Sequence, residues 1–257
     1  LTFEGGAGKN MRTILNRMPR DGWGFRVIPP EQVAASLPDL RAVSDEWLRD
    51  KRASEKGFSL GAFDEAYVRR FPIAVIEAGG RIVAFTNIWT APDNYEMSVD
   101  LMRFRADAPK GVMDALFTCM LKWGKEQGYA WMSLGMAPLA GLESGPLGPA
   151  WARLGHWLYR HGEAFYNFQG LRQFKQKFDP QWRPIYLVCP GGLLVPRVLA
   201  NVAALGVGNA VLGARRRCSR RSVGQASSGP ENGVKKPVSV TSFVSNSSNL
   251  QFGDRKS

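Results

Sequence analysis

The chain has little of the two residue types that most often form disulfides and bind metals. Its 257 residues contain three cysteines, Cys119, Cys189 and Cys218, and two histidines, His156 and His161. The cysteines define neither a disulfide framework nor a metal-ligand spacing, which favours a reducing compartment. No cysteine or acidic cluster surrounds the histidines, so we expect no metal site.

Long hydrophobic runs are also missing. The segment 193–214 is largely apolar, but Pro196, Arg197, Asn201 and Asn209 interrupt it. A membrane-spanning helix normally needs about 20 apolar residues with few polar breaks. The segment is therefore predicted to be an amphipathic helix that packs on the domain or lies at a bilayer surface.

Acidic residues are too few to balance the basic ones. The chain has 34 lysines and arginines against 22 aspartates and glutamates, a formal net charge of +12. This charge favours polyanionic partners such as nucleic acid or anionic lipid, although a solvated basic surface has the same composition. Residues 1–22 are predicted to form a basic helix, whose Arg12, Arg17 and Arg20 are candidates for phosphate contacts. Residues 215–257 have no hydrophobic period and are predicted to be a disordered basic tail.

The remaining composition, with 44% hydrophobic residues and eight tryptophans, is enough for one sizeable core. Periodicity and turn signals predict the following order: strand 23–28, helices within 30–51, a short helix starting near 61, strands 71–77 and 81–89, strand 95–101, a helix from 112 to 128, strand 129–134, helices 151–160 and 171–178, and strand 182–188. This order predicts one α+β domain over residues 23–192, with a mixed, mainly antiparallel sheet flanked by helices. That arrangement resembles the GNAT acyltransferases.

The predicted strand 95–101 carries the most informative alternation. Its polar and apolar residues fall on opposite faces: Glu96, Ser98 and Asp100 against Met97, Val99 and Leu101. With strict alternation, Arg103 shares the apolar face of Leu101. The strand must therefore bulge or end near Leu101 if Asp100 and Arg103 are to reach one pocket.

The turn after this strand differs from that of acetyl-CoA-dependent GNAT enzymes, which have a Gln/Arg-x-x-Gly-x-Gly/Ala loop that binds pyrophosphate. Here residues 103–111 read RFRADAPKG, with one glycine. Pro109 removes a donor N–H group, and Asp107 adds negative charge near the phosphate position. The loop disfavours coenzyme A and favours a different acyl donor.

Three separated motifs resemble one family: SVDLMR at 98–103, LGMAPL at 134–139 and FYNFQGLRQFKQKF at 165–178. Over residues 8–200 the chain is similar to the C-terminal domain of bacterial phosphatidylglycerol lysyltransferases, also called multiple peptide resistance factors. The resemblance implies two GNAT-like halves joined by a basic helix. This chain corresponds to the joining helix and the second half, so we expect a piece of a longer protein that also has the first half and a membrane-spanning part.

The resemblance also implies an activity, which is transfer of an aminoacyl group, lysyl rather than alanyl, from aminoacyl-tRNA to phosphatidylglycerol. The implied location is the cytoplasmic face of the bacterial inner membrane, and the implied result is a changed membrane charge and resistance to cationic peptides. Aminoacyl-tRNA is the co-substrate, and no resident cofactor is expected.

The candidate catalytic residues are Asp100, Arg103 and Lys175. Asp100 is expected to position the donor ammonium or the attacking hydroxyl, unless it only caps a helix or pairs with Arg103 or Arg105. Arg103 is a candidate for binding phosphate or the developing oxyanion. The family motif places a functional lysine at Lys175, which with Arg172 is expected to hold phosphate.

Three further substrate-binding candidates are Glu143, Tyr166 and Lys177. Glu143 is a candidate for recognising the ammonium of a lysyl donor, although a lone loop carboxylate is commonly just solvated. Tyr166 is either a hydrogen-bonding group in the pocket or an ordinary packed aromatic residue. Lys177 belongs to the same basic helix, which is either a phosphate clamp or a solvated face.

Two other functions remain open from the sequence. One is an acetyl-CoA-dependent N-acetyltransferase on the same fold, which predicts coenzyme A binding. The other is a non-catalytic module that docks tRNA or lipid through its basic surfaces, for which Asp100 and Lys175 would be dispensable.

Overall fold

A computed structural model describes residues 5–50, 63–137, 168–190, 198 and 240–252. The strands are β1 Trp23–Ile28, β2 Ile73–Ala78, β3 Arg81–Thr90, β4 Glu96–Phe104, β5 Trp131–Ala137, β6 Gln181–Pro190 and β7 Val240–Gln251. The helices are α1 Gly5–Arg17, α2 Val33–Asp50, α3 Glu65–Val68, α4 Val112–Glu126 and α6 Phe168–Gln176, with short 3-10 turns η1 Pro30–Gln32 and η2 Pro92–Asn94.

Within these described residues, seven strands form one sheet in the order β1-β2-β3-β4-β5-β7-β6. Every neighbouring pair is antiparallel except β4 and β5, which run parallel and are joined through α4. The predicted α+β, GNAT-like fold with a basic N-terminal helix is confirmed.

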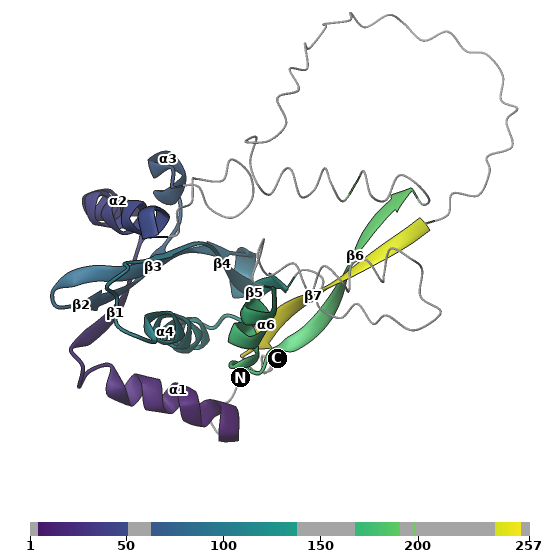
Figure 1. The fold of residues 1–257 in the computed structure, drawn as a ribbon, viewed down its shortest axis with the longest axis horizontal. Coiled ribbons are helices and arrows are strands. Elements are labelled where there is room, and N and C mark those ends of the chain that lie inside the picture. Colours follow the sequence, from purple (N-terminus) through teal and green to yellow (C-terminus); the bar gives the residue numbers. More distant parts are fainter. Residues whose placement is uncertain (1–4, 51–62, 138–167, 191–197, 199–239, 253–257) are drawn as a thin grey trace, which may run out of the picture.

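Helices cover both faces of the sheet (Figure 1). One core lies between the sheet and helices α1 and α4, where α4 buries most of its apolar residues. The second core lies between the sheet and helices α2 and α3. Strands β2 and β3 are buried on both faces, and their side chains pack into both cores. This is expected of central strands in a sheet that helices cover on both faces.

The predicted basic helix forms as α1, which lies against α4. The helix ends at Arg17; Met11 within it and Met18 just after it are buried, whereas Arg12, Arg17 and Arg20 are exposed. An amphipathic helix buries its apolar stripe and leaves its charges to solvent. The basic residues of this segment therefore lie on the surface, as the sequence predicted.

Strand β4 contains the predicted bulge. Val99 lies opposite Ile88 and Met102 lies opposite Thr86, so Asp100 and Leu101 together face the single residue Asn87. A bulge of this kind turns two successive side chains toward the same side of the sheet. The alternation of the strand is thereby shifted by one residue after Asp100.

The bulge makes one sequence prediction wrong. Leu101 does not share a face with Met97 and Val99, because it packs in the core beneath α2 while they pack in the core beneath α4. Arg103 follows Leu101 onto the α2 side. The extra residue in β4 thus places Asp100, Leu101 and Arg103 on one face of the sheet.

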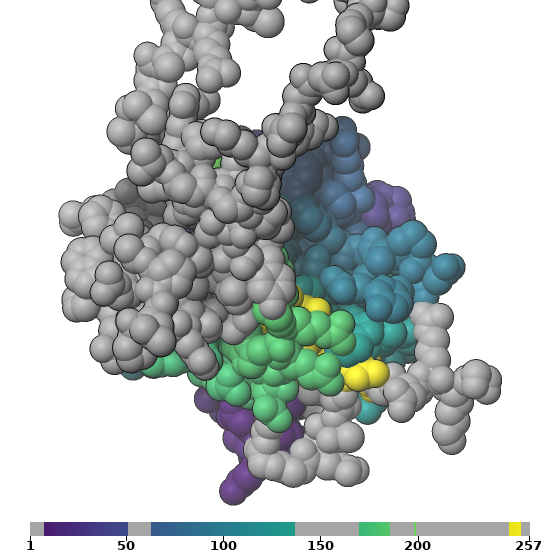
Figure 2. Space-filling model, turned by 90° about the vertical axis from the view of Figure 1, so that its right-hand side faces the viewer, coloured from purple at the N-terminus to yellow at the C-terminus, as the bar shows by residue number. Residues whose placement is uncertain are grey.

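The prediction of a disordered tail over 215–257 is wrong for residues 240–252. Strand β7 lies between β5 and β6 and pairs with both of them. Figure 2 shows its yellow residues beside the green residues of α6 and β6. The segment is rich in serine and asparagine, so it has little hydrophobic pattern, and two neighbouring strands supply its backbone partners.

Several predicted elements lie outside the described residues. These are the helix 151–160, nearly all of the segment 193–214, and the rest of the tail. Among the residues that are described, no helix combines the length and the apolar character needed to cross a bilayer.

Candidate functional site

Asp100 lies at the bulge of β4 and is almost fully buried. The hydroxyl of Tyr67, from α3, donates a hydrogen bond of 2.6 Å to Asp100 Oδ2 and accepts one of 3.0 Å from Trp89 Nε1. Burial, and then the Asp100 carboxylate, raise the pKa of Tyr67, so this hydroxyl stays protonated and keeps donating. These two hydrogen bonds fix the orientation of the Asp100 carboxylate, which the sequence predicted to be catalytic.

Helix α3 is held at its start by an N-cap, which sets the position of Tyr67. Asp64 caps the helix by accepting a 2.7 Å hydrogen bond from the Tyr67 backbone N–H. The Tyr67 ring also packs edge-on against Phe71, 5.0 Å between centroids. A short helix is stabilised mainly by such a cap and by packing, so both contacts serve the site.

Asn87 holds the bulge from the neighbouring strand. Its Oδ1 accepts a 2.7 Å hydrogen bond from the backbone N–H of Leu101, the second residue of the bulge. Asn87 is fully buried, next to the buried Thr86, in a strand whose other central residues are apolar. A bulged residue leaves the ladder, so a buried side-chain acceptor replaces the missing partner.

Arg103 lies on the same side of the sheet as Asp100 and is also nearly buried. Its guanidinium stacks over the Trp47 ring of α2 at 4.2 Å from the centroid, and its Nη1 donates to Met102 O at 3.1 Å. A guanidinium stacked on an indole keeps its charge with less water around it. This arrangement suits binding of an oxyanion or a phosphate.

Strands β4 and β5 pair over three positions only, from Glu96 with Trp131 to Ser98 with Ser133. Beyond Ser98, β4 carries Asp100 and Arg103. Beyond Ser133, β5 is paired on its other side with β7. The candidate residues of β4 therefore lie just past the point where the two parallel strands part.

Lys175 of α6 lies on the β5 side of this point. Its Nζ donates a 2.9 Å hydrogen bond to Met136 O, and its side chain is buried. Burial lowers the pKa of Lys175 from 10.5 to about 8. Helix α6 packs through Phe174 on the core beneath α4. Lys175 therefore belongs to a helix on the α4 side of the sheet, whereas Asp100 and Arg103 lie on the α2 side.

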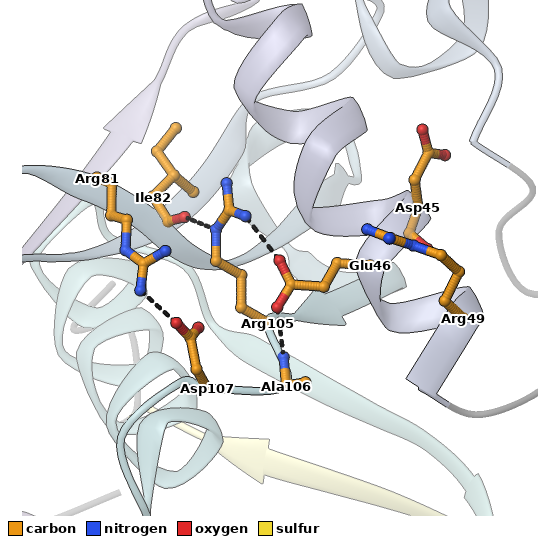
Figure 3. Close-up of polar contacts among 8 residues, drawn as sticks. All are labelled: Asp45, Glu46, Arg49, Arg81, Ile82, Arg105, Ala106 and Asp107. Atoms are coloured by element: carbon orange, nitrogen blue, oxygen red, sulfur yellow. Dashed lines mark hydrogen bonds and ion pairs between the residues drawn. The ribbon is translucent and has the colours of Figure 1, made fainter.

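The turn between β4 and α4 is held by the protein's own side chains (Figure 3). Glu46 of α2 accepts hydrogen bonds from Arg105 Nη1 at 2.7 Å and from the Ala106 backbone N–H at 3.0 Å, and Arg105 Nε donates to Ile82 O at 3.0 Å. Asp107 pairs with Arg81, which lowers the pKa of that carboxyl. The Glu46 carboxylate thus occupies a backbone N–H group of the turn that precedes α4. Arg105 pairs with Glu46, not with Asp100.

Comparison with known proteins places the chain in a family. The family model described as phosphatidylglycerol lysyltransferase, C-terminal, matches residues 1–189. The chain belongs to the phosphatidylglycerol lysyltransferase C-terminal family. The resemblance read from the three motifs is confirmed.

Curated phosphatidylglycerol lysyltransferases are similar over most of the chain. That of Bacillus subtilis (strain 168) is 43% identical over 187 residues, and that of Staphylococcus xylosus is 36% identical over 188 residues. These alignments cover 72% and 73% of this chain but only 22% of each relative. The chain therefore spans about a fifth of the length of these relatives.

Two solved structures share the fold. The C-terminal domain of a putative lysylphosphatidylglycerol synthetase from Agrobacterium fabrum is 40% identical with a TM-score of 0.70, over 82% of this chain and 62% of that one. L-PGS from Bacillus licheniformis is 42% identical with a TM-score of 0.67, over 80% and 62% of the two chains.

The remaining candidates of this lysyltransferase-family chain are placed in different ways. Arg172 lies 5.7 Å above the Trp182 ring, and Lys177 forms a 3.0 Å ion pair with Asp114 of α4. Lys177 therefore braces α6 against α4, and its role in substrate binding stays a prediction. Glu143 and Tyr166 lie outside the described residues.

Arg17, the last residue of α1, has three contacts with other parts of the chain. It pairs with Asp21 at 3.0 Å, donates to Lys110 O at 3.2 Å and stacks over Trp23 at 5.1 Å. Arg17 thus ties the helix to the turn before α4. Arg12 and Arg20 are exposed, and an electrostatic role for the three arginines stays a prediction.

Sequence reasoning missed three residues that contact the candidate site or the turn before α4: Tyr67, Asn87 and Glu46. An asparagine inside an apolar strand was a visible signal, because a buried amide needs a specific partner. Tyr67 and Glu46 carried no such signal, since their partners lie 33 to 60 residues away in sequence.

Proposed function

We propose that this chain is the catalytic part of an aminoacyl-tRNA-dependent lipid aminoacyltransferase, which transfers a lysyl group to phosphatidylglycerol. The supporting observation is the bulge of β4, which puts Asp100 and Arg103 on one face just beyond the point where β4 and β5 part. Membership of the phosphatidylglycerol lysyltransferase family supports the choice of substrates.

The reaction moves an acyl group that is already activated as an ester. The lipid hydroxyl oxygen bonds to the aminoacyl carbonyl carbon, and the bond from that carbon to the tRNA ribose oxygen breaks. The hydroxyl proton ends on the ribose oxygen. The protein therefore has to place the hydroxyl, accept its proton and stabilise an oxyanion.

The side chains have assignable roles in this proposal. Tyr67 engages one oxygen of Asp100, and we assign the other oxygen to the attacking hydroxyl or the donor ammonium. Arg103, stacked on Trp47, stabilises the developing oxyanion or binds phosphate. Lys175 with Arg172 holds phosphate from the β5 side, since an amine with a pKa of about 8 remains mostly charged at neutral pH.

The partners follow from the same proposal. The reaction takes place at the cytoplasmic face of a bacterial inner membrane, with aminoacyl-tRNA as co-substrate and without a resident cofactor. Arg12, Arg17 and Arg20 attract the tRNA backbone or anionic lipid. The first GNAT-like half and a transmembrane domain belong to the full-length protein, and the product gives resistance to cationic peptides.

The test is an assay with phosphatidylglycerol vesicles and lysyl- or alanyl-tRNA, with the missing half supplied. Mass spectrometry of the lipids is expected to find lysyl-phosphatidylglycerol and little of the alanyl product. Asp100→Ala, Arg103→Ala and Lys175→Ala are each expected to lower the rate by about 100-fold or more. No aminoacyl lipid from the wild-type protein would contradict the proposal.

The turn before α4 distinguishes this function from acetyl transfer. Glu46 already binds the Ala106 N–H, and Asp107 lies nearby, so a pyrophosphate would meet two carboxylates there. Calorimetry with coenzyme A is expected to detect no binding. Micromolar binding would favour the N-acetyltransferase instead.

The non-catalytic alternative makes the opposite mutational prediction. If the chain only docks tRNA or lipid, Asp100→Ala and Lys175→Ala retain full function in the reconstituted assay, while charge reversal of Arg12 and Arg17 abolishes it. The proposed enzyme shows the reverse order of severity.

A further inference from the structure

Strand β7 lies beyond the family-matched residues 1–189, yet it pairs with β5, whose Met136 carbonyl binds Lys175. It pairs with β5 so that Ser133 faces Asn249 and Met136 faces Ser247. Two residues of β5, at 134 and 135, therefore stand opposite the single residue Ser248. This is a second bulge, on the strand that carries the acceptor of Lys175.

Both backbone polar groups of Gly135 in this bulge are held by serine hydroxyls. The Ser248 hydroxyl donates to Gly135 O at 3.0 Å, and the Gly135 N–H donates to Ser133 Oγ at 3.3 Å. Ser248 is fully buried. Gly135 has φ of +77°, a conformation that residues with side chains rarely adopt, so the bulge needs this glycine and partners for its polar groups.

The amine of Lys175 rests directly on this bulge. Its Nζ is bonded to the carbonyl of Met136, the residue after Gly135, and lies 3.8 Å from the position a Gly135 Cβ would take. Any rotation of the Gly135 peptide therefore moves the carbonyl that anchors Lys175. Of its described basic neighbours in sequence, Lys177 pairs with Asp114 and Arg172 lies over the Trp182 ring.

We propose that Ser248 is a positioning residue for Lys175. Its hydroxyl holds the Gly135 carbonyl in the β5 bulge, and the bulge presents the Met136 carbonyl that anchors the lysine amine. A residue outside the family-matched part of the chain thereby completes the phosphate-binding side of the site. This inference deepens the proposed function and rests on it only for the effect on transfer.

Two serine variants on the same strand separate positioning from strand stability. Ser248→Ala removes the hydroxyl that holds the bulge. Ser247→Ala is the matched control, because the Ser247 hydroxyl donates within β7 to Asn249 Oδ1 at 3.1 Å. Ser248→Cys keeps the side-chain size and a weak donor, and it serves if the alanine variant does not fold.

The first measurement does not depend on activity. The Lys175 Cε resonance of ¹³C-lysine-labelled protein, assigned with Lys175→Met, is titrated with pH. The wild-type midpoint is expected near the pKa of about 8 that burial produces. In Ser248→Ala, water reaches the amine and the midpoint is expected to rise by about one pH unit or more. Ser248→Cys should lie between, and Ser247→Ala should match wild type.

The second measurement is transfer to phosphatidylglycerol in the reconstituted assay. Ser248→Ala is expected to lower kcat about tenfold and Ser247→Ala to leave it unchanged. A Lys175 titration in Ser248→Ala and Ser248→Cys that equals wild type overturns the inference, whatever the activity. A shifted titration in a protein that makes no aminoacyl lipid supports the inference and counts against the proposed function alone.

Discussion

Replacing Asn87 by alanine is expected to destabilise the protein and to misplace Asp100 at the same time. The substitution removes the only side-chain oxygen that Leu101 N–H is seen to use in the described structure, at 2.7 Å. Because Asn87 is fully buried, water does not readily replace it. Without this hydrogen bond the register of β4 against β3 is expected to shift by one residue, which would turn Asp100 to the other face of the sheet.

The magnitude follows from the burial of this hydrogen bond. Leaving a buried backbone donor without a partner costs about 1–3 kcal/mol in the free energy of unfolding. For a domain of this size each kcal/mol lowers Tm by about 2–4 °C. A displacement of Asp100 by about 1 Å lowers kcat/KM by up to about 100-fold.

The assay pairs thermal melting with the transfer rate to phosphatidylglycerol vesicles. Asn16→Ala is the control, because Asn16 is exposed on α1 and its loss should change stability by less than about 0.5 kcal/mol. If Asn87→Ala melts and reacts like Asn16→Ala, the bulge is not held by this amide. If Asn87→Ala loses stability but keeps its rate, the bulge does not position Asp100.

Three other outcomes are expected. Tyr67→Phe removes the hydroxyl that donates to Asp100. It is expected to lower the free energy of unfolding by about 1 kcal/mol and kcat/KM by about tenfold. An unchanged kcat/KM would show that Tyr67 has no role in the reaction. Burial lowers the pKa of Lys175 from 10.5 to about 8, so between these pH values the unfolded chain binds the lysine proton more tightly than the folded chain. The free energy of unfolding in urea should therefore rise with pH over that window, by up to about 3 kcal/mol relative to Lys175→Met. Parallel pH profiles of the two proteins would contradict this. Gly124→Ala places a methyl group against Met97 Sδ in the core and is expected to lower the free energy of unfolding by about 1–3 kcal/mol. A stabilised variant would show that Met97 moves aside without cost.

Local pattern was enough for most of the described elements. The hairpin of β2 and β3 follows from two apolar runs separated by Ala78, Gly79 and Gly80, and both glycines have positive φ as the turn requires. Helix α4 follows from apolar residues at three- and four-residue spacing, which the structure buries against the sheet. Each of these signals lies within neighbouring residues of the chain, so it can be recognised in the sequence.

Strand β7 was missed for the opposite reason. Its serines and asparagines do not distinguish a strand from a disordered segment. Its order comes from backbone hydrogen bonds to β5 and β6, which begin more than 50 residues earlier in the chain. Such pairing depends on edges that exist only after the rest of the sheet has formed.

The α+β architecture, the family and the candidate charged residues could be predicted from the sequence alone, because periodicity and motifs are properties of neighbouring residues. It also required a bulge near Leu101 if Asp100 and Arg103 were to act together. Three contacts could be seen only in the folded protein: Asn87 binds the bulge, Tyr67 binds Asp100, and Lys175 binds a carbonyl of β5. Each of these contacts joins two elements, and which atoms meet is fixed by the packing of the whole sheet and its helices.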